Sequence, residues 1–225
     1  MVIGNVSHRD SSSAAIFWMF NDSWPVSNGW TIIDYYLRKK LDYHPVRRAF
    51  DQIVVVVTKE GSDINVYGVN DQPNEWKGSL RYGIFTLKGA KPMDKLLNVK
   101  IAGNQSVKLA TFPARDLDKE GVNLSGAFAL LQKDGNTISQ NKLLLAHFKD
   151  LTFAKPTIHV KVENGQAVFE SDTFVWGATL DINGESNVPD NCFDLLPGIP
   201  YSISWSDKDK QPVVLKTGNE LEMGR

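Results

Sequence analysis

The chain has 225 residues, a formal net charge of −1 at pH 7 and a sequence pI of about 6.4. This balance indicates neither a nucleic-acid nor an anionic-membrane partner, and no apolar run approaches the ~18 residues of a membrane-spanning helix. The length suffices for two domains of ~100–150 residues. The single cysteine, Cys192, cannot form an intrachain disulfide. The first residues have no signal-peptide pattern, and the compartment is left open.

The first predicted element is a strand over residues 14–20, an apolar run that ends at the sequence Asn-Asp-Ser-Trp-Pro of residues 21–25. A short apolar run bounded by turn residues is typical of a strand buried on both faces, and proline cannot continue a strand. Where a barrel strand ends, chemistry usually follows. We expect four side chains to gather there: Trp18, Asn21, Asp22 and Trp24. The alternative is an ordinary core strand with a polar turn.

A helix is predicted within residues 38–50, where apolar residues alternate with basic ones. Pro45 would lie in its first turn or kink it, and the basic residues are interpreted as a solvated helix face. A strand followed by a helix is one βα unit, which cannot close a barrel alone. Either the other units precede this chain or the chain is not part of a barrel.

After Phe50 the pattern changes to short β-type stretches without a long helix. The predicted strands lie at 53–57, 64–69, 80–85, 96–101, 107–112, 128–132 and 137–145. This spacing is typical of an antiparallel sandwich, and Asp134-Gly135 predicts a type I′ hairpin turn. We place this domain at residues 51–147.

The segment 147–156 is interpreted as a boundary, after which the alternation restarts at Ile158. Asn164-Gly165 predicts a second tight hairpin. We place a smaller sandwich at residues 156–225, with Trp176 and Trp205 in its core. A domain of 70 residues buries a modest core, so we expect it to lean on its neighbour.

Two stretches resemble glycoside hydrolase family 2, most closely its β-mannosidase branch. The first is Phe-Trp-Met-Phe-Asn-Asp-Ser-Trp-Pro at residues 17–25, followed by Ile-Asp-Tyr-Tyr at 33–36 and Val-Arg-Arg-Ala-Phe at 46–50. It resembles the end of the family's catalytic barrel, which typically reads Trp-Gln-Leu-Asn-Asp-x-Trp-Pro. The second is Asp-Asn-Cys-Phe-Asp-Leu-Leu-Pro-Gly at 190–198, which resembles the family's last immunoglobulin-like domain.

The resemblance implies a mainly β fold: two immunoglobulin-like β-sandwich domains preceded by a strand–helix remnant of a (β/α)8 barrel at residues 1–50. The implied activity of the parent enzyme is hydrolysis of terminal β-mannosides by a retaining, exo-acting mechanism. One alternative is an exo-β-glucosaminidase or another family 2 β-glycosidase fragment. Another is a non-catalytic β-sandwich module that binds carbohydrate or protein. No cofactor or metal is expected, since the four histidines lack metal-ligand spacing.

Retaining glycosidases need two carboxylates ~5–5.5 Å apart, and the resemblance places both glutamates on barrel strands upstream of residue 14. All eight glutamates of this chain lie at or after Glu60. We therefore expect no catalytic residue here and no activity of the chain alone. The resemblance implies that Trp18 floors the subsite of the cleaved sugar, because an aromatic ring can pack against its C–H face.

The same resemblance places Asn21, Asp22 and Trp24 in the wall of the subsite. The usual Gln and Leu of the motif are replaced here by Met19 and Phe20, so any contact specific to the Gln is in doubt. For Asp22 the alternative is a turn-capping carboxylate, and for Trp18 it is plain core packing.

The expected partners are a mannoside or other β-glycoside in the intact enzyme and an upstream barrel domain, without nucleic acid or membrane. Without barrel neighbours, the apolar strand must fold onto the first sandwich, stay mobile, or pair with another chain as a homodimer. The resemblance also implies a cis Trp18–Met19 peptide in the intact barrel. Such a bond costs ~3–4 kcal/mol, so we expect a trans bond in this chain.

Overall fold

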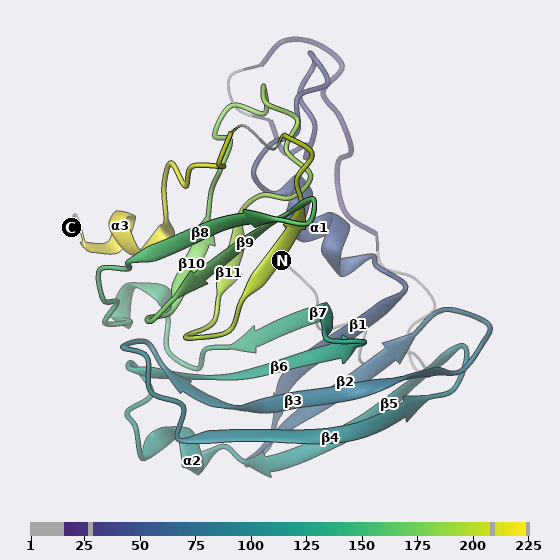
Figure 1. The fold of residues 1–225 in the computed structure, drawn as a ribbon, viewed down its shortest axis with the longest axis vertical. Coiled ribbons are helices and arrows are strands. Elements are labelled where there is room, and N and C mark those ends of the chain that lie inside the picture. The colour runs from purple at the N-terminus through teal and green to yellow at the C-terminus, as the bar shows by residue number, and fades with distance from the viewer. Residues whose placement is uncertain (1–15, 27–28, 208–209, 224–225) are drawn as a thin grey trace. The chain divides into compact units, whose positions relative to one another are not determined.

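A computed structural model describes residues 16–26, 29–207 and 210–223 (Figure 1). The chain is mainly β, and its sheets are antiparallel. Residues 51–153 form one compact unit, whereas residues 16–50 and 154–225 together form the other. Among the described residues, no helix has the length and apolar character needed to cross a membrane.

The first unit is a sandwich of two sheets, as the strand spacing predicts. One sheet has the order β1-β2-β5, formed by β1 (Ile53–Glu60), β2 (Asp63–Asn70) and β5 (Gln105–Pro113). The other has the order β4-β3-β6-β7, formed by β4 (Met93–Ile101), β3 (Trp76–Thr86), β6 (Ser125–Lys133) and β7 (Asn136–Leu143). A short helix α2 (Arg115–Asp118) precedes β6, and a 3-10 turn η2 (Phe148–Asp150) follows β7.

The core of this sandwich is built by strand alternation. Every second side chain of β1 points inward, and Val55 packs in one cluster with Leu80 of β3 and Leu131 of β6. Since successive strand residues face opposite sides, alternation puts these side chains between the two sheets. The predicted hairpin at Asp134-Gly135 is confirmed, because both residues have positive φ, 50° and 80°, as a type I′ turn requires.

The strands of the second unit form two small sheets. β12 (Tyr201–Ser204), β9 (Gln166–Ser171) and β8 (Ile158–Glu163) pair in that order, and β10 (Val175–Ala178) pairs with β11 (Phe193–Leu195). Phe193 links the two sheets: its ring contacts Phe169 edge-on with centroids 5.0 Å apart and stacks on Tyr201 at 4.5 Å. Trp205 packs against this core, as predicted.

One helix of this unit was not predicted, α3 (Gly218–Met223). It begins with a capping box, in which Thr217 N donates to the Glu220 carboxylate and Glu220 N donates to the Thr217 hydroxyl. The pattern Thr-x-x-Glu is a known sequence signal for a helix start, so this helix could have been found.

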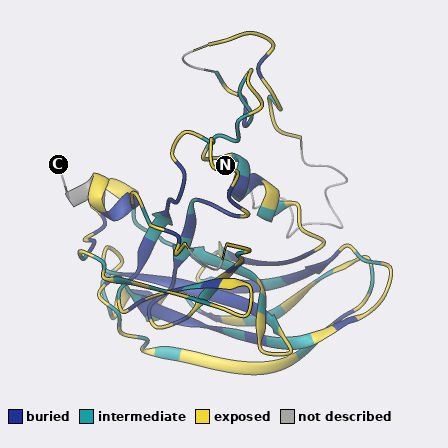
Figure 2. Cartoon of the chain, turned by 45° about the horizontal axis from the view of Figure 1, so that its top comes forward, coloured by how far each residue is buried: buried dark blue, intermediate teal, exposed yellow. Residues whose placement is uncertain are grey.

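Residues 16–50 belong to the same unit as the last sandwich. The predicted helix is confirmed as α1 (Tyr43–Ala49), with Pro45 in its first turn and one buried face, dark blue in Figure 2. The predicted strand at 14–20 is not: residues 16–20 are outside any strand, and only isolated bridges join Asn21 to Ile33 and Ile33 to Lys39. A strand needs hydrogen-bonded neighbours, and residues 16–19 have no bridge partner among the described residues. Residues 14 and 15 lie outside the described part.

The peptide bond between Trp18 and Met19 is cis. The expectation of a trans bond in this chain was therefore wrong, and the bond has the geometry that the family resemblance implies.

Candidate functional site

The candidate site starts from a loop closed by Lys40. Its Nζ donates to Oδ2 of Asp22 at 2.9 Å and to Oγ1 of Thr31 at 2.6 Å. The backbone adds to this closure, since Asp22 N donates to Ile33 O at 3.1 Å. Asp22 is only 8% exposed, and the Lys40 ammonium group compensates the charge of its carboxylate.

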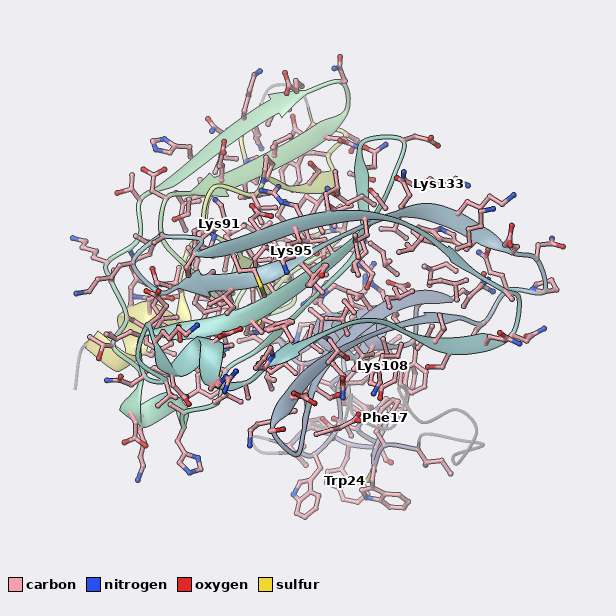
Figure 3. All side chains as sticks on the ribbon, turned by 90° about the horizontal axis from the view of Figure 1, so that it is seen from below. Phe17, Trp24, Lys91, Lys95, Lys108 and Lys133 are labelled. Carbon is pink, nitrogen blue, oxygen red and sulfur yellow. The ribbon has the colours of Figure 1, made fainter. Side chains whose placement is uncertain are left out.

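Residues 16–26 and 29–37 expose many large apolar side chains, which we together call the aromatic surface. Its large exposed side chains are Ile16, Phe17, Trp18, Phe20, Trp24, Val26, Trp30, Tyr35, Tyr36 and Leu37. Trp18 is 76% exposed and Trp24 66%, so neither is a core residue in this structure. Figure 3 shows Phe17 and Trp24 on the same side of the molecule, with Trp24 extending away from the ribbon. Exposed rings of this kind can pack against apolar sugar faces or another protein surface.

The four predicted site residues thus take different positions. Asn21 is exposed, and its Nδ2 donates to the backbone oxygen of Asp22 at 3.3 Å. Asp22 is buried and bonded to Lys40, whereas Trp18 and Trp24 are open to solvent. In this arrangement Asp22 supports the loop, and the two indole rings are available for contact.

A second cluster, centred on Asp190, joins α1 to the last sandwich. Arg48 Nη1 lies 2.5 Å from Asp190 Oδ1, and its guanidinium also donates to the backbone oxygens of Asn191 at 3.1 Å and Cys192 at 2.9 Å. Tyr201 Oη donates to Asp190 Oδ2 at 2.5 Å. His44 Nδ1 is 3.5 Å from Asp190 Oδ1, at the outer limit of hydrogen bonding.

The neighbouring groups of this cluster change one another's pKa values. Burial alone would raise the pKa of Asp190, but His44, the Arg48 charge and the Tyr201 hydroxyl outweigh it and hold that pKa below its usual value. Burial and the neighbouring Asp190 carboxylate raise the pKa of Tyr201. The cluster is therefore an ionised carboxylate that contacts a protonated phenol and a guanidinium in a partly buried position.

A third contact joins the segment before α1 to the loop between β10 and β11, two stretches that run side by side in Figure 1. Arg38 binds Asp34 at 2.6 Å and Glu185 at 3.2 Å, and Lys39 Nζ donates to Asn187 at 2.7 Å. A cavity of about 420 Å³ is lined by residues 36–39, His44, Asp181 and residues 184, 185, 187 and 188. The segment before α1 is thus attached to the last sandwich by polar contacts of Arg38 and Lys39.

Sequence reasoning missed Lys40, Arg48 and Tyr201. The bases of residues 38–48 were interpreted as a solvated helix face, which is wrong for Arg48, because its side chain is only 26% exposed and binds Asp190. The sequence did contain one half of this contact, since Asp190 and Asn191 begin the second stretch that resembles the family. Its partner 142 residues away could not be identified from local pattern.

In the described ranges, no group of three or more His, Cys, Asp and Glu residues is arranged to hold a metal ion. Cys192 is half-buried and has a positive φ of 51°, and it serves Arg48 through its backbone oxygen.

Comparisons with known proteins agree with this architecture. Residues 62–150 match the family model of the mannosidase Ig/CBM-like domain. A β-mannosidase B of Thermothelomyces thermophilus is 41% identical over 231 residues, covering 89% of this chain and 27% of the relative. A β-mannosidase B of Aspergillus niger is 27% identical over 208 residues, covering 82% of this chain and 24% of the relative. The chain thus spans about a quarter of the length of these curated relatives.

Solved structures share this fold. A β-D-mannosidase from Dictyoglomus thermophilum superposes with a TM-score of 0.72 at 29% identity, covering 92% of this chain and 25% of that one. An exo-chitosanase of Amycolatopsis orientalis has a TM-score of 0.54 at 16% identity, covering 83% of this chain and 27% of that one; this likeness is one of fold alone.

The paired sandwiches and the aromatic surface, with these relatives, place the chain among the immunoglobulin-like parts of glycoside hydrolases. More particularly, it is a C-terminal, β-mannosidase-like part of a family 2 glycoside hydrolase.

Proposed function

We propose that this chain is the part of a retaining, exo-acting β-mannosidase that completes the sugar site with Trp18, Asn21, Asp22 and Trp24. In the intact enzyme Trp18 would pack against the apolar face of the terminal mannose, and Trp24 and Asn21 would line the wall. The observation that carries this proposal is the pair of exposed indoles on the loop that a partly buried ion pair between Lys40 and Asp22 closes. The names of the relatives support mannose as the sugar.

The division of labour follows from the carboxylates. Acid/base and nucleophile glutamates would come from a barrel domain upstream, because every glutamate of this chain lies at or after Glu60. We keep the predicted parts, 1–50 as the barrel end and 51–147 and 156–225 as sandwiches, as the proposed organisation. The last sandwich would hold the barrel end in place because its Asp190 binds Arg48 of α1.

The aromatic surface also needs a partner. Ile16 is 93% exposed and Trp30 80%, and an apolar surface of this extent marks an interaction site. We propose the upstream barrel domain as that partner. A homodimer through the same residues is the other expectation, and it predicts a concentration-dependent mass in light scattering.

A chimera tests the proposed site. The segment of the Thermothelomyces β-mannosidase B that aligns with this chain is replaced by this chain, and hydrolysis of an aryl β-mannoside is measured. We expect activity, and we expect Trp18→Ala and Trp24→Ala each to lower kcat/KM by roughly tenfold or more through the lost aromatic contact.

Trp30→Ala is the matched control, because Trp30 is an equally exposed indole of the same surface that is not assigned to the sugar. It should leave kcat/KM within about twofold. An active chimera in which Trp18 and Trp24 can be removed without loss would contradict the proposed roles. Preference of this chimera for an aryl β-glucosaminide over the mannoside would favour the exo-β-glucosaminidase alternative.

A further inference from the structure

The last sandwich contains one dipeptide, Asp190-Asn191, that holds two separate pieces of the molecule. Asp190 binds Arg48 of α1 at 2.5 Å. Asn191 binds the loop after β10: its Oδ1 accepts from Leu180 N at 2.8 Å and its Nδ2 donates to Asp181 O at 2.6 Å. Both residues are buried, so these bonds are shielded from water and correspondingly strong.

The loop held by Asn191 is itself rigidly shaped. The carboxylate of Asp181 accepts three backbone N–H groups, those of Asn183 at 3.1 Å, Gly184 at 2.9 Å and Ser186 at 2.7 Å. This places Glu185 against Arg38 and Asn187 against Lys39. The dipeptide thus contacts α1 directly, and it contacts the segment before α1 through the loop that follows β10.

Between these two attachment points lies Lys40, the residue that closes the loop of Asp22. Its backbone N donates to Ile32 O at 3.0 Å, while its Nζ binds Asp22 at 2.9 Å. A shift of residues 38–48 would carry Lys40 with it and release Asp22. The geometry therefore connects Asp190 to the loop of Trp18 and Trp24 through a short series of side-chain contacts.

We propose that Asp190 is a positioning residue for the sugar site: with Asn191, it fixes residues 38–48 and thereby the Lys40–Asp22 pair in the loop that carries Trp18 and Trp24. This inference rests on the proposed function only for the identity of the site. The positioning itself is a property of the chain and can be measured without sugar.

Amide hydrogen exchange on the chain tests it. The reporters are the amides of Asp22, Ile32, Ile33 and Lys40, each bonded to a backbone oxygen. In Asp190→Asn we expect these amides to exchange about tenfold faster or more, which corresponds to the loss of one charge-assisted bond. Amides of β9 (Gln166–Ser171) should change by less than about threefold, and Asp190→Glu should restore most of the protection.

Asp94→Asn is the matched control. Asp94 also forms a hydrogen-bonded ion pair with an arginine, Arg81, at 2.8 and 2.7 Å, but in the first sandwich. It should leave the four reporter amides unchanged. Arg48→Met is the second variant in case Asp190→Asn does not fold, because it removes the helix side of the pair and keeps the bond of Tyr201 to Asp190.

Unchanged reporter amides in a folded Asp190→Asn or Arg48→Met chain would overturn the proposal. So would equal acceleration of the reporters and β9, which would make Asp190 a residue of general sandwich stability. If Trp18→Ala left kcat/KM of the chimera unchanged while the exchange pattern of Asp190→Asn was as expected, the proposed function would be refuted. The positioning role of Asp190 would still hold.

Discussion

The hydroxyl of Tyr201 and the carboxylate of Asp190 form one of the shortest hydrogen bonds in the second unit, at 2.5 Å from Oη to Oδ2. The phenol thereby stabilises the ionised acid from the side opposite to Arg48, which binds Oδ1. A tyrosine whose pKa is raised and an aspartate whose pKa is lowered are the expected partners in such a bond.

This relationship predicts an acid-sensitive second unit. The pKa of Asp190 is lowered in the folded chain, so its contribution to stability is complete above the unfolded value of about 4. It is lost as pH falls through the lower folded value. We expect Asp190→Asn to be less stable than the parent chain at neutral pH and to lose less stability on acidification. The exchange free energies of the Asp22, Ile32, Ile33 and Lys40 amides, followed in the two chains at a series of pH values, measure this; parallel pH profiles for the two chains would contradict it.

Lys40→Met should loosen the aromatic surface. It leaves the buried carboxylate of Asp22 without its cation, at a cost of roughly 1.5–3 kcal/mol for a hydrogen bond to a charged group. The measurement is the exchange free energy of the Asp22 and Ile33 amides. Lys39→Met is the control, because Lys39 binds the neutral Asn187 at an exposed position and should cost less than about 1 kcal/mol. Equal effects of the two substitutions would show that Asp22 does not need the charge.

The sandwich core predicts a contrast between two leucines. Leu131→Ala empties a fully buried position of β6 and should cost about 2–5 kcal/mol. Leu96→Ala, on the edge strand β4, removes a side chain that is 64% exposed and should stay within about 0.5 kcal/mol. Denaturant unfolding of the first unit measures both. A cost of Leu131→Ala near that of Leu96→Ala would mean that the two sheets do not pack as described.

The chain alone should not hydrolyse an aryl β-mannoside. Retention needs two carboxylates about 5–5.5 Å apart at the sugar, and Asp22, which lies between the two indoles in the sequence, is bonded to Lys40. Turnover of the purified chain is compared with buffer. Activity that survives Asp22→Asn would contradict the view of the chain as part of a larger enzyme. Activity lost in that variant would indicate a different site.

The sandwich strands could be predicted because their information is local. Alternation in β2 and β3, and the two residues of each tight turn, are determined within a few positions of the sequence. The strand at 14–20 failed for the opposite reason. Its apolar composition indicates burial, but burial in a sheet depends on neighbours that local composition does not specify.

The candidate site was predicted by motif rather than by geometry. Resemblance singled out Trp18 and Trp24, and the structure leaves both indoles open to solvent. The roles of Lys40 and Arg48 could not be predicted, because a basic residue on a helix has the same local pattern whether it is solvated or paired. Only the fold brings Arg48 to Asp190, 142 residues later.

That separation has a consequence for folding. α1 has seven residues, too few to be stable as an isolated helix in water, and its charged partner is synthesised after the entire first sandwich. The first sandwich can complete its core as soon as β7 is made, whereas residues 16–50 must wait for Asp190 to emerge. Contacts of this sequence separation are costly to close. During synthesis, the segment that carries the indoles of the aromatic surface can therefore be fixed through Arg48 only after residue 190 has been made, although it is translated well before that residue.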